Sequence, residues 1–379
     1  MRKFKKTAES SLAFVALTFG VLALILAMAG CTLSNNGGQG SSANVFAVDS
    51  KNGNVYEIDT QALTAASTPL LSIGQNASGE LVFCGNTGFL AVGSYLNTAP
   101  GLYYFDVTSQ APVAKLLGSL GNTISAQYIC ILSTTKGYVS SADYSGVYTS
   151  AVYPFNPSKP LQDLGEAISG LPTNVYPQDI AVADGRVYVA DNANNVVYRL
   201  DANGTAVEST FAAKTKGTTG LLAGKYDYDG DGDADAGVFV ANTGGYDANW
   251  NPLPGSIDFI PASASADDAV TTVISDLSAA RLAAFGQTKL VATGYSHTYL
   301  VELSGQQPRS AGSHTTAAKA EVTFDGKSFG SFDVNIHDGY AYVPDGANTV
   351  YRFSSSGDDV KAITVGKTGE FVTNIGIRE

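Results

Sequence analysis

Apolar and polar positions alternate along most of this chain after about residue 40, in short runs separated by Asp, Asn and Gly. One pair of runs occurs three times, at residues 187–200, at 341–353 and, in a weaker form, at 45–59. Strict alternation over a few residues, joined by turn-forming residues, predicts β-hairpins. No amphipathic helical period occurs after residue 40, so we expect an all-β protein.

Each repeat has one aromatic or aliphatic residue that opens its second strand, and this residue recurs every 44 to 52 positions. The series is Phe46, Leu90, Tyr138, Tyr188, Phe239, Leu290 and Tyr342. A repeat of this length built from short strands is typical of propeller blades, because one small sheet cannot bury both of its faces alone. The sequence therefore predicts a seven-bladed β-propeller of four-stranded blades over residues 44–379.

The two ends of this region complement each other. The first repeat lacks an innermost strand, since only Gly/Ser-rich sequence precedes it, while residues 371–377 form a spare strand at the C-terminus. We expect the C-terminal strand to join the first blade and close the ring. Closure matters because an open ring would leave unpaired strand edges exposed.

The N-terminus has the composition of a secretory signal. Basic residues at 2–6 precede an apolar stretch at about 12–26, and small residues lead to Cys31. The Ala-Gly-Cys ending resembles the lipobox of bacterial lipoproteins, although Met28 replaces the usual Leu. The resemblance implies a signal peptide over residues 1–30, cleavage before Cys31 and diacylation of that cysteine. An ordinary signal peptide and an uncleaved membrane anchor are the alternatives.

Residues 31–43 read as a lipidated cysteine followed by a flexible tether, because a Ser/Gly/Asn composition cannot offset the entropy of ordering a packed segment. The lipoprotein resemblance implies a location in the cell envelope. Thr32 stands where many lipoproteins retained in the inner membrane have Asp. The implied address is the outer membrane in a Gram-negative cell, and otherwise the outer face of the plasma membrane.

The chain is acidic, with a formal net charge of −12. Loss of residues 1–30 removes four basic groups and one Glu, which leaves about −15 on the mature chain. This charge argues against nucleic acid as a partner, because nucleic acids require clusters of Lys and Arg. Only Cys84 and Cys130 then remain beside Cys31, either as a disulfide between neighbouring blades or as two buried thiols.

One acidic loop contains the most specific chemical pattern in the chain. Five carboxylates alternate over nine residues: Asp227, Asp229, Asp231, Asp233 and Asp235. They would repel one another strongly unless a hard cation neutralises them, and Ca²⁺ accepts such a set of oxygen ligands. The twelfth position is Val238 rather than Glu, so the loop is not a full EF-hand. The alternative is a solvated acidic turn.

A β-strand rather than a helix follows this loop. Together, the loop and strand closely resemble the FG-GAP-type repeat of β-propellers over about sixteen residues. The resemblance implies a structural Ca²⁺ bound by Asp227, Asp229, Asp231 and Asp235, with a backbone carbonyl from Asp233. The repeated Tyr-Val-Ala-Asp and Val-Tyr-Arg-Leu patterns are similar to the YVTN/NHL class of propellers, which includes lactonase-like proteins. That similarity implies a fold more than an activity.

Polar residues open the predicted innermost strands, and in a propeller these positions meet at the mouth of the central channel. They are Glu80, Gln127, Asp179, Arg281, Asp333 and Asn374. Polar groups that converge in a concavity are the default place for a ligand. The alternative is that strand ends are polar and the channel holds only water.

Two long loops are expected on the same face. The loop at 94–101 contains Tyr95, and the loop at 244–255 contains Tyr246 and the single Trp of the chain, Trp250. Exposed aromatic side chains on such loops stack on sugars or anchor protein contacts. They can equally fold down and pack against their own loops.

The inventory of catalytic residues is small. His297, His314 and His337 do not share a predicted site, and no phosphate-binding loop or Cys-x-x-Cys pair occurs. The leading hypothesis is a non-catalytic, membrane-anchored binding platform for an envelope protein or glycan. The alternative is a calcium-dependent lactonase-like hydrolase, in which Glu80, Asp179, Asp333 and Asn374 hold a catalytic metal in the channel.

Overall fold

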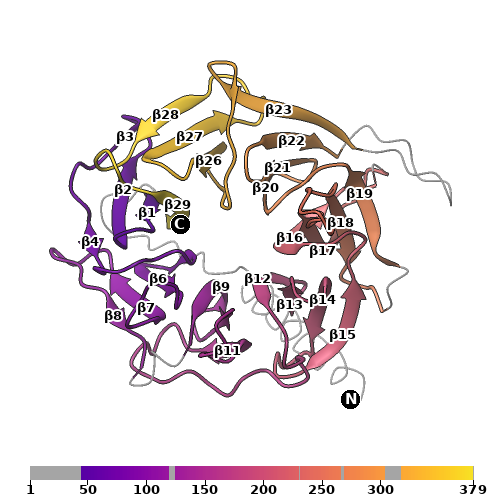
Figure 1. Cartoon of the computed structure of the whole chain (residues 1–379), viewed down its shortest axis with the longest axis horizontal. Coiled ribbons are helices and arrows are strands. Elements are labelled where there is room, and N and C mark those ends of the chain that lie inside the picture. The colour runs from indigo at the N-terminus through magenta and orange to yellow at the C-terminus, as the bar shows by residue number, and fades with distance from the viewer. Residues whose placement is uncertain (1–43, 119–123, 230, 266–268, 304–316, 379) are drawn as a thin grey trace, which may run out of the picture.

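Seven antiparallel sheets surround a central axis in the structure, which is a computed structural model (Figure 1). It describes residues 44–118, 124–229, 231–265, 269–303 and 317–378. The predicted signal peptide, Cys31 and the tether lie outside these ranges. The described residues contain no helix that is both long enough and apolar enough to span a membrane.

Each blade runs outward from an innermost strand A to strands B, C and D. Blade 1 contains β29 (Val372–Arg378), β1 (Asn44–Asp49), β2 (Asn54–Asp59), β3 (Thr64–Ala65) and β4 (Leu71–Ser72). Blade 2 contains β5 (Leu81–Cys84), β6 (Thr87–Val92), β7 (Gly101–Asp106) and β8 (Lys115–Leu116). Blade 3 contains β9 (Ala126–Ser133), β10 (Lys136–Ser141) and β11 (Ala151–Phe155).

Blades 4 to 7 follow the same order along the chain. Blade 4 contains β12 (Pro177–Ala183), β13 (Arg186–Asp191), β14 (Val196–Leu200) and β15 (Val207–Ala212), and blade 5 contains β16 (Thr218–Tyr226), β17 (Asp235–Asn242), β18 (Ser256–Pro261) and β19 (Thr271–Ser275). Blade 6 contains β20 (Arg281–Phe285), β21 (Lys289–Thr293), β22 (Thr298–Glu302), β23 (Ala318–Phe324) and β24 (Lys327–Ser328). Blade 7 contains β25 (Asn335–His337), β26 (Tyr340–Pro344), β27 (Thr349–Ser354) and β28 (Lys361–Thr364).

The third blade differs from the predicted four strands. Its sheet has three, and the segment after β11 runs beside that strand without regular pairing. Gly165 and Ile168 donate their backbone N–H groups to the carbonyls of Pro154 and Val152 at 2.8 and 2.9 Å. An irregular segment thus occupies the place of strand D.

The predicted all-β, seven-bladed architecture is confirmed, and the repeated apolar residue explains how the blades pack. All seven members of the series that begins with Phe46 are fully buried, at 0% exposure. Seven hydrophobic clusters fill the seven spaces between adjacent blades; Phe46 and Leu90, for example, share the cluster between blades 1 and 2. The spacing of the repeat therefore arises because each blade buries one such residue.

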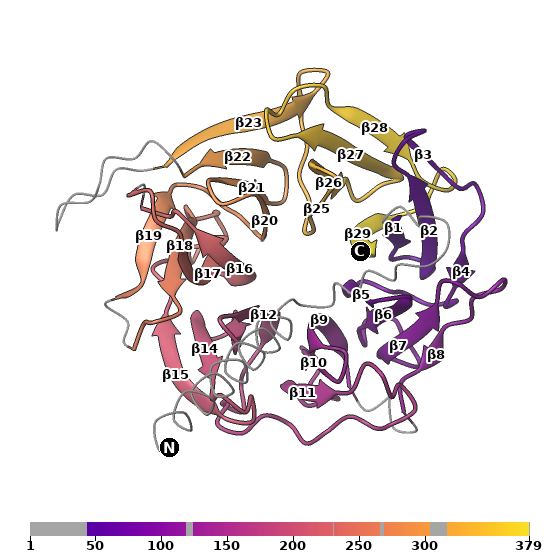
Figure 2. The same cartoon turned by 180° about the vertical axis from the view of Figure 1, so that it is seen from behind.

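The C-terminal strand closes the ring as predicted. β29 pairs antiparallel with β1, with Ile377 opposite Val45 and Ile375 opposite Ala47. The view from behind shows β29 as the innermost strand of the first blade, beside β5 (Figure 2). The first blade is therefore built from both ends of the described chain.

The aspartate of the repeated pattern ends strand B and stabilises the turn into strand C. Asp49, Asp191 and Asp345 each accept a hydrogen bond from the backbone N–H two residues later, at 2.8 to 3.1 Å. Such turns are the usual role of Asp in β-rich folds. These carboxylates hold the B–C loops in place around the channel.

Antiparallel pairing assigns the loops to two opposite faces. In blade 5, Thr218 lies opposite Asn242 at one end of the hairpin, and Tyr226 lies opposite Asp235 at the other. Strand A begins on the face that holds the B–C loops, which we call the mouth face. The A–B loops lie on the other face, which we call the rear face.

Candidate functional site

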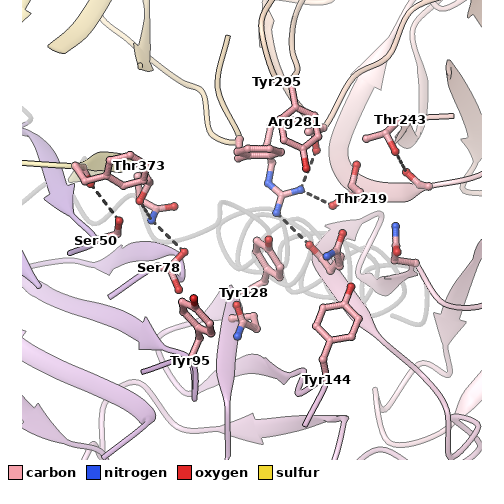
Figure 3. Close-up of a pocket in the computed structure, with 18 of the residues that line it drawn as sticks. Ser50, Ser78, Tyr95, Tyr128, Tyr144, Thr219, Thr243, Arg281, Tyr295 and Thr373 are labelled. Carbon is pink, nitrogen blue, oxygen red and sulfur yellow. Dashed lines mark hydrogen bonds between the residues drawn. The ribbon is translucent and has the colours of Figure 1, made fainter. Parts of the chain in front are cut away.

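A pocket of about 870 Å³ occupies the mouth face over the central channel (Figure 3). It is lined by the first residues of the innermost strands and by the B–C loops. Of the six predicted ring residues, Gln127, Arg281 and Asn374 line this pocket. The mouth of the channel is therefore the main concavity among those found in the described residues.

Exposed aromatic side chains surround the pocket. We define the aromatic rim as Tyr95, Tyr144, Tyr246, Tyr295, Phe332 and Phe371, all of which line the pocket. Their exposed fractions range from 49% for Tyr246 and Phe332 to 82% for Tyr144. Large exposed aromatic groups that gather around one concavity are uncommon on a soluble surface and mark an interaction site.

The rings of the rim support one another. Tyr144 stacks on Tyr176, with ring centroids 4.0 Å apart. Tyr295 and Phe332 meet edge to face at 4.5 Å. Such pairs hold aromatic side chains in defined orientations and so restrict the rotation of Tyr144, Tyr295 and Phe332.

The sequence analysis found only part of this rim. Tyr95 and Tyr246 were predicted and do line the pocket. Trp250 is 80% exposed with its ring 6.0 Å from that of Tyr246, but it is not among the pocket-lining residues. Tyr144 and Tyr295 were missed, although a pattern reveals them: an aromatic residue stands two to four positions after strand B in blades 2, 3, 5 and 6.

The three predicted carboxylates lie deeper in the channel, where each connects neighbouring blades. Their partners are backbone N–H groups of the next innermost strand. Glu80 accepts from Ile129 at 2.7 Å, Asp179 from Leu221 at 2.7 Å, and Asp333 from Ile375 at 2.6 Å. These bonds join blades 2 and 3, blades 4 and 5, and blades 7 and 1.

Arg281 crosses the channel above these carboxylates. Its guanidinium donates to the backbone carbonyls of Thr219, Ala280 and Gln178, the last two at 2.9 and 3.1 Å. Its charge lies 4.3 Å from the centre of the Tyr128 ring and 4.0 Å from a carboxylate oxygen of Asp179. One side chain thus connects blades 3, 4, 5 and 6.

The electrostatics of the channel follow from burial. Desolvation, then repulsion from Asp179, raises the pKa of Glu80 to about 8, although the Ile129 N–H opposes the shift. Desolvation also raises the pKa of Asp333 to about 6 and raises that of Asp179, while Arg281 lowers both. Protonation of Glu80 near neutral pH therefore relieves repulsion within the channel.

The hydrolase alternative uses the channel residues as ligands of a catalytic metal. It requires at least three oxygen ligands that converge on one ion. Among the described residues, the group of acidic, His or Cys side chains with ligand atoms close enough for this lies in the acidic loop, not in the channel. The amide of Asn374 donates to the Ser78 carbonyl and to the Thr373 hydroxyl. The channel residues are used in joining blades.

The acidic loop connects β16 and β17 on the rear face, away from the pocket. Ligand oxygens of Asp227, Asp229 and Asp231 all lie within 4.8 Å of one another. One carboxylate oxygen of Asp227 and one of Asp229 are buried and have no hydrogen-bond partner. Unpartnered buried oxygens are costly unless a positive group satisfies them.

The remaining loop residues are less closely placed. Asp235 is exposed at the start of β17, and its pKa is raised first by partial burial and then by the four neighbouring carboxylates. Asp233 donates its backbone N–H to Asp231 at 2.8 Å. Tyr228, between the first two ligands, stacks on Phe259 at 4.1 Å and anchors the loop to blade 5.

The histidines and cysteines of the described residues neither line the pocket nor belong to the acidic loop. His297 contacts Glu321 at 2.7 Å on the surface, His337 is the last residue of β25 in blade 7, and His314 falls outside the described residues. Cys84 and Cys130 are not joined in a disulfide, and burial raises the pKa of Cys130. The structure thus agrees with two separate thiols rather than a disulfide, although both residues are half-buried and not buried as that alternative had it.

Comparisons with known proteins report on the fold. No family model matches the sequence, and no curated protein matches it either. Among solved structures, the computationally designed Ika8 protein is 11% identical over 89% of this chain and 91% of its own, with a TM-score of 0.53. A chain from a nidogen/laminin complex is 12% identical over 89% and 99% of the two chains, with a TM-score of 0.46. The first similarity is one of overall fold alone and says nothing of activity.

Proposed function

We propose that this protein is a cell-envelope lipoprotein whose propeller is a non-catalytic binding platform, with the mouth face as its binding surface. The observation that supports it is the aromatic rim: six exposed rings around one pocket, contributed by several blades. Exposed apolar rings are unfavourable in water. A partner that covers them removes apolar area from solvent, which favours binding. Rigid strands position the loops that bear them, as is common in binding proteins.

Membrane attachment follows in this proposal from Cys31. The lipid would be joined to the propeller by the tether of residues 31–43, which can place the mouth at a distance from the bilayer. The acidic mature chain keeps the propeller itself off an anionic membrane surface, because like charges repel. The partner is then a component of the envelope that reaches the mouth face.

The proposal gives the acidic loop a structural role. Asp227, Asp229 and Asp231 would hold Ca²⁺, with further oxygens from Asp235 and the Asp233 carbonyl. Two buried oxygens without hydrogen donors and an all-oxygen ligand set support this assignment. The ion would neutralise the loop and fix the turn between β16 and β17, without contact with the pocket.

A capture experiment tests the proposed function. The full-length protein serves as bait for envelope extracts, in parallel with a variant in which Tyr95, Tyr144 and Tyr295 are replaced by Ala. A matched control is Leu161→Ala, which removes a side chain that is 81% exposed and does not line the pocket.

The wild type and the control are expected to recover the same envelope component, and the triple variant is expected to lose it. Equal recovery by all three baits would show that the mouth face is not the binding surface.

A further inference from the structure

The mouth face has an unusual distribution of chemistry. Protein interfaces have an apolar centre and a polar margin. Here the order is reversed, because the aromatic rim forms the margin and the centre is polar. The polar lining inside the rim includes hydroxyl groups of Ser50, Ser78 and Thr219 and side-chain amides of Gln127 and Gln178. Arg281 and Tyr128 lie in the middle of the view (Figure 3). A flat protein partner cannot bury this arrangement without leaving polar groups unpaired.

The pocket also has little free charge. Of the described residues that line it, only Lys51 and Arg281 bear a charge. The Arg281 guanidinium already donates to three backbone carbonyls and stacks on Tyr128. The three channel carboxylates do not line the pocket. An anionic or cationic ligand would therefore find little compensation for its desolvation.

We propose that the mouth binds a neutral oligosaccharide; this inference rests on the proposed function and names its ligand class. Sugar rings present apolar C–H faces that stack on aromatic rings, and hydroxyl groups that pair with amides and hydroxyls. The rim supplies the first kind of contact and the centre supplies the second. A pocket of about 870 Å³ is near the upper end of the usual range of roughly 300–1,000 Å³ for small-ligand sites, which leaves room for more than one sugar ring.

The spacing of the rim fits a chain of sugars better than a single ring. Tyr144 is fixed by Tyr176 in blade 4, while Tyr295 and Phe332 pair between blades 6 and 7. The two pairs therefore stand on different parts of the mouth, and the polar centre lies between them (Figure 3). Each pair offers one stacking position, and a chain can occupy both.

Calorimetry with defined sugars is the first part of the test. The probes are cellohexaose, maltohexaose and chitohexaose, together with an oligogalacturonate of equal length as the anionic comparison. The full-length protein is kept in a detergent without a sugar headgroup, since such a headgroup would compete. Tyr144→Ala and Tyr295→Ala are expected to weaken binding of a neutral probe about tenfold each, which is the loss of one aromatic contact of about 1.4 kcal/mol.

Two controls separate stacking from other effects. Tyr144→Phe keeps the ring and is expected to keep affinity, and Leu161→Ala is expected to change nothing. Neutral contacts also predict that affinity changes less than about twofold between 50 and 500 mM NaCl, because no counterions are released. Tighter binding of the oligogalacturonate, with strong dependence on salt, would overturn the inference.

The second part of the test does not depend on the choice of sugar. Envelope extracts are treated either with periodate, which cleaves the vicinal diols of sugars, or with a protease, before capture by the wild type. Loss of rim-dependent capture after periodate and its survival after proteolysis are the expected results. The opposite pattern would identify a protein partner; the inference would then be wrong while the proposed function would stand. Capture that never depends on the rim would overturn both.

Discussion

Carboxylates gather at two places in this protein, and the two groups use them in different ways. In the channel, Glu80, Asp179 and Asp333 each accept a hydrogen bond from the adjacent blade and share the charge of Arg281. In the acidic loop, buried oxygens of Asp227 and Asp229 have no hydrogen-bond partner. Both groups combine several acidic residues, but of the two only the loop leaves buried carboxylate oxygens without a hydrogen-bond partner.

The comparison teaches that the number of acidic residues does not identify a metal site. What matters is whether the surrounding backbone has already satisfied their oxygens. The channel carboxylates close the ring of blades by joining neighbouring innermost strands. The loop carboxylates are available to a cation, which we propose is Ca²⁺. Substitutions in the two groups should therefore differ in how much they change the stability of the protein, in how this change depends on pH, and in how it responds to metal.

The largest effect is expected from Arg281→Ala. This change leaves three backbone carbonyls without their donor and removes the positive charge from the channel, so we expect a loss of about 3–5 kcal/mol in the free energy of unfolding. The loss should be greater at pH 8 than at pH 5, because the acidic groups of the channel are ionised at the higher pH. Thermal unfolding at both pH values measures it.

The control for this experiment is Arg186→Ala. Arg186 is paired with Glu208 at 2.7 Å, but both side chains are about one-third exposed or more. Such a pair contributes less than about 1 kcal/mol. If the two substitutions cost the same, Arg281 is not the central support of the channel.

Removal of calcium comes next. At a free concentration one hundred times the dissociation constant, bound Ca²⁺ adds about 2.7 kcal/mol to the stability of the folded state. Chelation should therefore lower the unfolding temperature of the wild type and leave that of Asp229→Ala unchanged. Asp358→Ala removes one exposed charge from a loop of blade 7 and should retain the full response to chelation. An equal response from both variants would contradict a calcium site in the loop.

A smaller effect with a clear sign is expected from Glu80→Gln. The pKa of Glu80 in the folded protein, about 8, lies above its ordinary value of 4.5. Between these values the folded state binds more protons than the unfolded state, so stability falls as the pH rises through this window. The substituted amide cannot ionise, and its oxygen can still accept from Ile129. The variant should match the wild type in stability at pH 4 and be more stable than the wild type at pH 9.

The smallest effect on stability is expected at the rim. Tyr144 is 82% exposed, so Tyr144→Ala should change the free energy of unfolding by less than about 0.5 kcal/mol. The same variant should lose about tenfold in affinity at the mouth. Chemical denaturation and calorimetry on one preparation compare the two quantities. A large loss of stability would show that the ring serves packing rather than binding.

The fold could be predicted from the sequence because its physical cause recurs. A buried residue such as Tyr188 or Tyr342 is required once in every blade, and an aspartate such as Asp191 recurs at the turn after strand B in blades 1, 4 and 7. The buried residue therefore recurs at regular spacing in the sequence. The closing strand at 371–377 was also predictable, because the first blade lacked an innermost strand and the C-terminal strand was left over after the last blade.

The site was less predictable because its parts come from different blades. Strand position alone placed Arg281 at the channel, but not its bonds across the channel to Gln178 and its stacking on Tyr128. Nothing local in the sequence distinguishes a carboxylate that accepts from the next blade from one that is free. Tyr144 and Tyr295 follow their strands in short loops that look ordinary alone, and only the closed ring brings them together.

The most direct test of the account is hydrogen–deuterium exchange on the full-length protein, with and without each ligand. The account predicts that the best neutral oligosaccharide slows exchange in the B–C loops of the mouth face, around residues 94–97, 143–148 and 294–297. It predicts that Ca²⁺ slows exchange around residues 226–235 on the rear face. Protection of the rear face by the sugar, or of the mouth by the metal alone, would contradict the division of the molecule into a binding face and a metal-stabilised face.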